Sequence, residues 1–140
     1  MSKVDRQKVY QKYDGRCAYC GREIIYKDMQ VDHIIPKSKY SERHQCLIVK
    51  GRLFTEYGLN DFQNLNPACR RCNHYKRSNS LSEFRMLMST IHKRIASQYI
   101  SKVALDYGII MFKPFHGRFY FELHPDATIR ALNAETGEEL

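Results

Sequence analysis

The stretch VDHIIP, residues 31–36, places an aspartate and a histidine side by side in a β-branched run that ends at a proline. Strand interiors rarely bury a carboxylate or an imidazole without a partner. A neutral imidazole can take a proton from water, and a carboxylate can ligate a hard divalent ion. Because adjacent strand residues point to opposite faces, Asp32 and His33 can serve one substrate only where the strand ends or bulges. Pro36 favours such an end.

Four of the five cysteines form two C-x-x-C pairs, Cys17 with Cys20 and Cys69 with Cys72. This spacing brings two thiolates within reach of one ion, and two such turns complete a tetrahedral zinc site. The alternative, a pair of redox or disulfide motifs, is not favoured in an intracellular basic protein. A closed Cys₄ site has no open position for substrate, so this zinc would be structural. Cys46 is interpreted as a small buried apolar residue.

The joint order of these motifs resembles the HNH endonuclease family. The chain reads CAYC, VDHIIPKS, QNLNPACRRCN and HYKRSNS over about residues 15–80. The resemblance implies an α+β fold built on a ββα-metal, or His-Me, finger, which the Cys₄ zinc site would fasten. It also implies hydrolysis of DNA phosphodiester bonds with Mg²⁺ or Mn²⁺, leaving 5′-phosphate and 3′-hydroxyl ends.

The same resemblance implies a role for each residue of the motif. His33 would be the general base, and Asp32 would ligate the catalytic Mg²⁺ or Mn²⁺. Asn73 would be the second metal ligand, and Asn64 would fix the loop and orient the base. These four residues are the predicted catalytic set.

Two positions leave an alternative open. Asn66 lies close enough to Asn64 to compete for the middle role, and His74 directly follows Asn73. On a helix, neighbouring residues point about 100° apart, so only one of Asn73 and His74 can face the metal. Asn73 is preferred, because Cys-Asn-x-x-Lys is the usual wording of the family motif.

The chain carries a formal charge of +8, which points to a polyanionic partner. Residues 1–95 hold 19 of the 23 basic residues and 9 of the 15 acidic ones, so the basic surface belongs to this part. Basic side chains near the site can neutralise phosphates beside the cut. Those expected to contact DNA are Arg70, Arg71, Lys76, Arg77, Lys37 and Lys39.

The sequence predicts only some of the helices and strands that must position these residues. Residues 3–13 favour a helix, and residues 24–35 favour two short strands. Ser80 to Glu83 has the form of a capping box, and it opens the strongest helical signal of the chain. The segments IIMFK and RFYFELH flank PFHG, which predicts a C-terminal β-hairpin. We expect a nuclease core over 1–95 and, over 96–140, an extension packed on the same domain.

The leading hypothesis is a DNA endonuclease acting on double-stranded DNA. A non-cleaving, zinc-stapled DNA-binding module is the alternative, as is a nuclease subunit of a phage packaging, restriction or defence complex. No apolar run is long enough for a membrane span, so a cytoplasmic location, in a bacterial or phage-infected cell, is expected. The sequence leaves open the target, nicking against double-strand cutting, and whether the protein is a homodimer or part of a larger complex.

Overall fold

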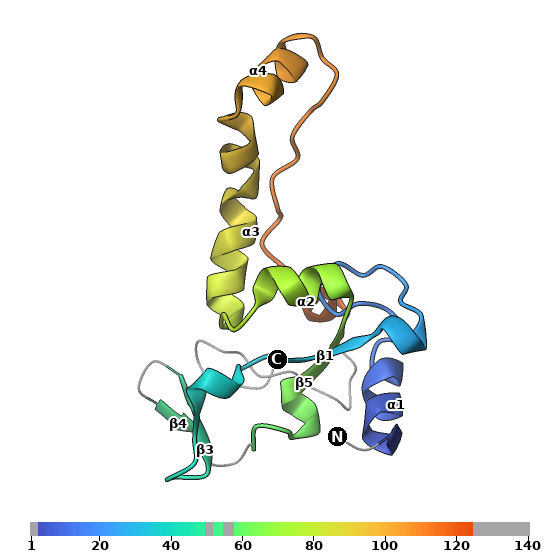
Figure 1. Ribbon diagram of the computed structural model, residues 1–140, viewed down its shortest axis with the longest axis vertical. Helices are drawn as coiled ribbons and strands as arrows, with labels where there is room; N and C mark the ends of the chain where they lie inside the picture. The colour runs from blue at the N-terminus through green and yellow to red at the C-terminus, as the bar shows by residue number, and fades with distance from the viewer. Residues whose placement is uncertain (1–2, 50–51, 55–57, 125–140) are drawn as a thin grey trace.

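The computed structural model describes residues 3–49, 52–54 and 58–124 of the chain. Its centre is a two-stranded antiparallel sheet of β1 (Gln30–His33) and β5 (Leu65–Ala68). Helix α2 (Arg70–Lys76) follows β5 after one residue and packs against both strands (Figure 1). The register pairs Asp32 with Asn66. Strand, strand and helix therefore form the expected ββα unit.

The chain between the two central strands folds into a second sheet, of three short strands. Its order is β2-β3-β4, and both pairings are antiparallel. The strands are β2 (Tyr40–Ser41), β3 (Cys46–Val49) and β4 (Arg52–Phe54). Short 3-10 helices precede and follow β1, as η1 (Tyr26–Asp28) and η2 (Lys37–Lys39), and precede β5, as η3 (Phe62–Asn64). Cys46 is fully buried, as expected for a small apolar residue.

Only one of the two strands expected over residues 24–35 is present. The segment Tyr26–Asp28 is a 3-10 turn, and β1 begins at Gln30. Upstream, Glu23 forms an isolated bridge with Arg16 rather than part of a longer strand. The prediction of a first strand was wrong because the extended residues around Ile24 close the turn that carries Cys17 and Cys20.

Helices α1 and α3 flank this centre. Helix α1 (Lys3–Gln11) packs beside β5. Helix α3 (Leu81–Ala96) begins at the expected capping box, in which Ser80 accepts from the Glu83 backbone and the Glu83 carboxylate accepts from the Ser80 backbone. Among the described residues, no helix is long and apolar enough to cross a membrane.

An arm projects from the ββα unit (Figure 1). It consists of α3 and α4 (Tyr99–Asp106), and the chain after α4 returns alongside these helices toward the core. The expected division at residue 95 falls one residue before the end of α3. At the base of the arm, Arg85 binds both carboxylate oxygens of Glu122 at 2.7 and 2.9 Å.

The predicted C-terminal β-hairpin was wrong. The segment 110–118 has no regular strand, and Tyr120–Leu123 form a short helix, α5. The alternating aromatic pattern instead buries Phe119 and Phe121 in the core. The Phe121 backbone N–H donates to the Ala18 carbonyl at 2.7 Å, so the segment is held by the cysteine turn and needs no partner strand.

Aromatic packing joins this returning segment to the rest of the core. The ring of Tyr19 makes edge contacts with Phe84, Phe119 and Phe121 at centroid distances of 5.4 to 5.8 Å. Phe84 also stacks on Phe119 at 4.9 Å. Burial of such rings is the main apolar contribution to a core of this size, and it links α3, α5 and the cysteine turn.

Candidate functional site

The four cysteines of the two C-x-x-C pairs lie together. The sulfur atoms of Cys17, Cys20, Cys69 and Cys72 are all within 4.8 Å of one another. The Sγ atoms of Cys20 and Cys69 are 4.0 Å apart. Tetrahedral zinc with bonds of about 2.3 Å to sulfur separates its ligands by about 3.8 Å. The cluster therefore has the donor chemistry and the spacing that a structural zinc ion requires.

Two local structures hold these thiols. Residues 16–23 form a tight turn in which the Cys17 N–H donates to the Arg22 carbonyl at 2.8 Å. Gly21 has a φ of +78°, and a Cβ there would lie 2.6 Å from a ring carbon of Tyr120. Cys69 caps the N-terminus of α2, where its sulfur accepts from the Cys72 N–H. The cysteines thus fasten the first turn of α2 to a segment about fifty residues earlier.

The titration of the thiols reflects this crowding. Hydrogen bonding from Cys17 lowers the pKa of Cys20, and hydrogen bonding with Cys20 raises the pKa of Cys17. Thiols this close compete for the same protons, and a bound cation would allow all four to ionise.

Asp32, the predicted metal ligand, is buried between two partners. The Tyr19 hydroxyl donates to its Oδ2 atom, and the Lys76 ammonium nitrogen lies 3.1 Å from the same oxygen. The Oδ1 atom makes only a 3.4 Å contact with Lys76. Burial raises the pKa of Asp32, against the lowering influence of the Lys76 charge.

Lys76 is not a surface residue, so its predicted role as a DNA contact was wrong. Its side chain is fully buried, and its ammonium also donates to the His33 carbonyl at 2.9 Å. Burial lowers the pKa of Lys76, while Asp32 opposes that shift. A lysine placed three residues after Asn73 on α2 points inward to β1, and this inward direction is what the sequence did not reveal.

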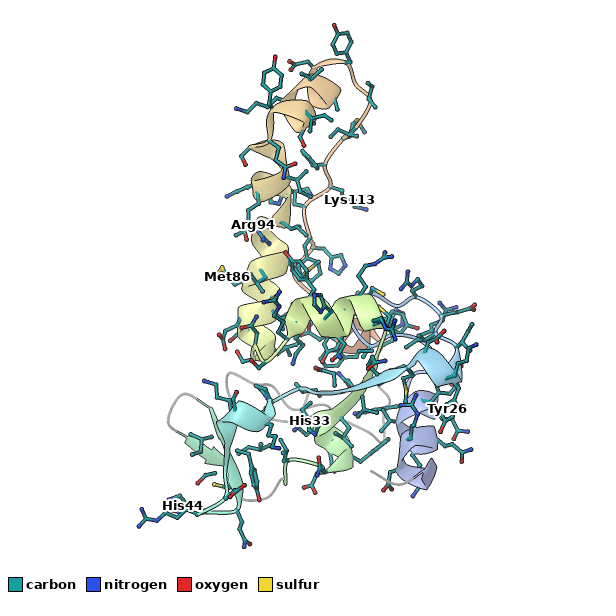
Figure 2. The ribbon with its side chains drawn as sticks, in the orientation of Figure 1. Tyr26, His33, His44, Met86, Arg94 and Lys113 are labelled. Carbon is teal, nitrogen blue, oxygen red and sulfur yellow. The ribbon has the colours of Figure 1, made fainter. Side chains whose placement is uncertain are left out.

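His33 lies half-buried at the end of β1, beside the β1–β5 sheet and away from the arm (Figure 2). Its Nε2 atom is 2.8 Å from the Oδ1 atom of Asn60. An amide oxygen only accepts, so Nε2 donates in this bond, and in a neutral ring Nδ1 is then the nitrogen with the lone pair. Asn60 was not singled out from the sequence, where it is one polar residue of an unpatterned loop.

Asn64 fastens the chain immediately after His33. Its Oδ1 atom accepts from the Ile35 N–H at 2.8 Å, and its Nδ2 atom donates to the Ile35 carbonyl at 3.1 Å and the Leu59 carbonyl at 2.9 Å. Asn64 is fully buried. These bonds fix the chain where β1 ends, close to the backbone of His33.

Asn66 occupies a different place, opposite Asp32 in the β1–β5 register. Its Oδ1 atom lies 3.3 Å from the ammonium of Lys12, which also donates to the Leu65 carbonyl at 2.7 Å. Burial lowers the pKa of Lys12 to about 7. Asn66 therefore supports the interior of the sheet, whereas Asn64 contacts the loop after His33.

Asn73 and His74 lie on different sides of α2. Asn73 is half-buried and precedes Lys76 by three residues, so the two share a helix face, and Lys76 reaches Asp32 from it. His74 is exposed. The face of α2 turned to β1 is therefore the one that carries Asn73.

The remaining basic residues predicted to contact DNA are on the surface. Two groups lie next to the sheet: one on and just after α2, and one on η2, the turn that follows β1 and Pro36. The exposed members are Arg70, Arg71, Arg77, Lys37 and Lys39.

The donors near β1 also suit a hard divalent ion. Asp32 and Asn73 offer carboxylate and amide oxygens, the ligands that Mg²⁺ and Mn²⁺ prefer. A carboxylate has about four lone-pair positions, and Oδ1 of Asp32 is only weakly engaged by Lys76. These residues could therefore hold such an ion while Oδ2 stays bound to Tyr19 and Lys76.

Comparison with known families finds a match over part of the chain. The family model for the HNH endonuclease matches residues 17–46, which include Cys17, Cys20, Asp32 and His33. Among solved structures, the crystal structure of the Type II-C Cas9 enzyme from Actinomyces naeslundii matches with a TM-score of 0.43 and 24% identity. That match covers 59% of this chain and 8% of that chain, so this chain corresponds to a small part of that enzyme's length. No curated protein matches. The resemblance to the HNH endonuclease family is thus confirmed, and residues 17–46 carry it.

Proposed function

We propose that the protein is a divalent-metal-dependent DNA endonuclease whose general base is His33. The observation that supports this most strongly is the position of His33 at the end of β1, in a ββα unit that brings Asp32 and the Asn73 face of α2 together. The match of residues 17–46 to the HNH endonuclease family points to the same chemistry.

His33 would activate the attacking water. Its Nδ1 lone pair can accept the water proton, while Asn60 holds the ring through Nε2. The resulting imidazolium remains paired with the Asn60 amide oxygen. Asn64 keeps the following loop in place, so the ring enters the reaction in one orientation.

Asp32 and Asn73 would hold Mg²⁺ or Mn²⁺. When bound, such an ion supplies positive charge for the phosphate and for the departing 3′-oxygen. The protein's contribution is to present the Asp32 carboxylate in a fixed direction, which the Tyr19 and Lys76 contacts achieve. The products would be 5′-phosphate and 3′-hydroxyl ends.

The exposed cations would position the duplex. Arg70, Arg71 and Arg77 lie on or just after α2, and Lys37 and Lys39 lie on the turn after β1. Contacts of this kind go to phosphates and carry no sequence information. Binding should therefore weaken with rising salt in proportion to the phosphates neutralised.

A zinc-stapled DNA-binding module without cleavage is the second candidate. The pairing of Lys76 with Asp32 favours it, because an ammonium already balances the charge of the carboxylate that would bind the metal. Both candidates need the zinc site and the basic surface, and they differ only in the use of Asp32 and His33.

The deciding experiment incubates zinc-loaded protein with supercoiled plasmid in the presence of Mg²⁺, of Mn²⁺ or of neither ion. The nuclease proposal predicts nicked or linear DNA only with the added ion. Retarded but intact plasmid in every lane would instead support the binding module.

A further inference from the structure

Helix α4, at the end of the arm, carries an apolar stripe that the described part of the protein leaves uncovered. The stripe consists of Tyr99, Ile100, Val103 and Tyr107, of which Tyr99 and Tyr107 are 83% and 79% exposed. On a helix these positions fall within about 100° of arc, which makes one continuous face. Ile109 and Met111, in the chain that follows, are also exposed.

The stripe is not the face that holds α4 to its own chain. Ser101 is buried, and Ala104 and Leu105 are half-buried, on the opposite side of the helix. An eight-residue helix that is apolar on its exposed face as well as on its packed face is expected at an interaction surface rather than in free solvent.

The charges beside the stripe suggest the partner. Lys102 and Asp106 are exposed on one flank of α4, and neither has an ion-pair partner within the described ranges. They balance each other, so this end of the arm lacks the positive charge that a nucleic acid contact requires. A pair of opposite charges one helical turn apart is self-complementary when two copies of the helix run antiparallel about a two-fold axis.

We propose that the α4 stripe is a homodimer interface in which two copies of this helix pack antiparallel, with the axis near Val103. In that arrangement Tyr99 of one copy lies beside the partner's Tyr107, and Val103 packs on the partner's Val103. Lys102 then faces the partner's Asp106, and the same contact repeats across the axis. Four tyrosines around an aliphatic centre match the aromatic-rich core of protein interfaces.

The consequence deepens the proposed function, on which it rests. A single ββα-metal site cuts one strand of a duplex. A dimer through the arms would carry two such sites on opposite sides of a two-fold axis, the symmetry that cutting both strands of a duplex requires.

The test measures the mass of the zinc-loaded full chain by sedimentation equilibrium over a range of micromolar concentrations. The wild-type protein should show a concentration-dependent dimer. Val103→Glu should abolish it. Met86→Glu is the matched control, because Met86 is 66% exposed on α3 and points away from the returning segment that carries Lys113 (Figure 2).

A mixing experiment separates contact between copies from contact within one helix. Lys102→Glu alone puts a carboxylate opposite the partner's Asp106 at both symmetric contacts. Asp106→Lys alone likewise puts an ammonium opposite the partner's Lys102. Each substitution should therefore weaken self-association by about tenfold or more. An equimolar mixture of the two variants restores both opposite-charge pairs and should form a heterodimer. No contact within one helix is restored by mixing.

A monomeric wild-type protein at every concentration, or variants that stay monomeric when mixed, would overturn this interface and leave the stripe to another protein. Neither result depends on cleavage, so neither of them tests the proposed nuclease function. If both proposals hold, Val103→Glu should still nick the plasmid. It should no longer cut both strands in one binding event, so linear DNA should appear only after nicked plasmid has accumulated.

Discussion

Lys76 places its ammonium nitrogen 3.1 Å from Oδ2 of Asp32, and both side chains are buried. The contact joins the last turn of α2 to the interior of β1, and the same ammonium caps the His33 carbonyl at 2.9 Å. One lysine thus sets both the direction of the proposed metal ligand and the backbone of the proposed base. This contact links the helix that carries Cys69 and Cys72 at its start to the strand that carries the proposed base.

Replacing Lys76 with methionine should destabilise the protein by about 3–5 kcal/mol, because Asp32 would keep a buried charge without its partner. Urea denaturation of zinc-loaded protein measures this. Arg77→Met is the matched control, since Arg77 is exposed at the next position and should change stability by less than about 0.5 kcal/mol. Equal losses in the two variants would contradict the buried pair.

Removal of zinc should unfold the first turn of α2, where Cys69 and Cys72 lie. Cys69→Ser should lose the metal, measured as bound zinc per chain, and lower the thermal midpoint, because one of the four ligands is gone while the serine hydroxyl can still cap α2. Cys46→Ser, the control, should retain one zinc per chain, since Cys46 lies outside the cluster. Loss of zinc in the control would mean that the four-cysteine assignment is incomplete.

Asn64→Ala and Asn60→Ala should separate stability from activity. The buried Asn64 side chain satisfies three backbone groups, so its loss should cost at least about 2 kcal/mol in denaturant unfolding. The exposed Asn60 touches the His33 ring, so its loss should spare stability and slow cleavage by about tenfold or more. A loss of stability in Asn60→Ala, with slower cleavage but unchanged stability in Asn64→Ala, would contradict both assignments.

Lys12 should make stability depend on pH. Burial lowers its pKa in the folded protein to about 7, whereas the unfolded chain keeps the ordinary value of 10.5. Between these values the unfolded state holds one more proton, so stability rises with pH across the window and the gain is lost as pH falls through about 7. The rise should disappear in Lys12→Met, measured as the difference between the two unfolding free energies at each pH. Parallel curves for the two proteins would rule out titration of a buried Lys12.

Motif spacing predicted the parts of the fold that short-range chemistry determines. The C-x-x-C turns and the capping box at Ser80 depend on a few neighbouring residues, and both are present. The strand before Pro36 is present too, although it ends at His33 rather than at Ile35. Lys76 was misjudged because a basic residue on a helix is usually solvated, and only the packing of α2 on β1 turns it inward.

The C-terminal hairpin was misjudged for a related reason. Alternating aromatic residues at 119 and 121 have the period of a strand, but here both side chains enter a core made by Tyr19 and Phe84. That core exists only after distant segments have come together. Asn60 and Lys12 were missed likewise, since their partners lie in chain segments distant in sequence.

The most direct test of the central claim is single-turnover cleavage of a plasmid by His33→Ala, with His44→Ala as the control. His44 lies exposed outside the ββα unit (Figure 2), and its loss should leave the rate unchanged. His33→Ala should bind DNA with wild-type affinity and cut it about 10²- to 10⁴-fold more slowly, because only the proton acceptor is gone. Cleavage by His33→Ala at the wild-type rate, with the ion present and the protein folded, would contradict the assignment of His33 as the base.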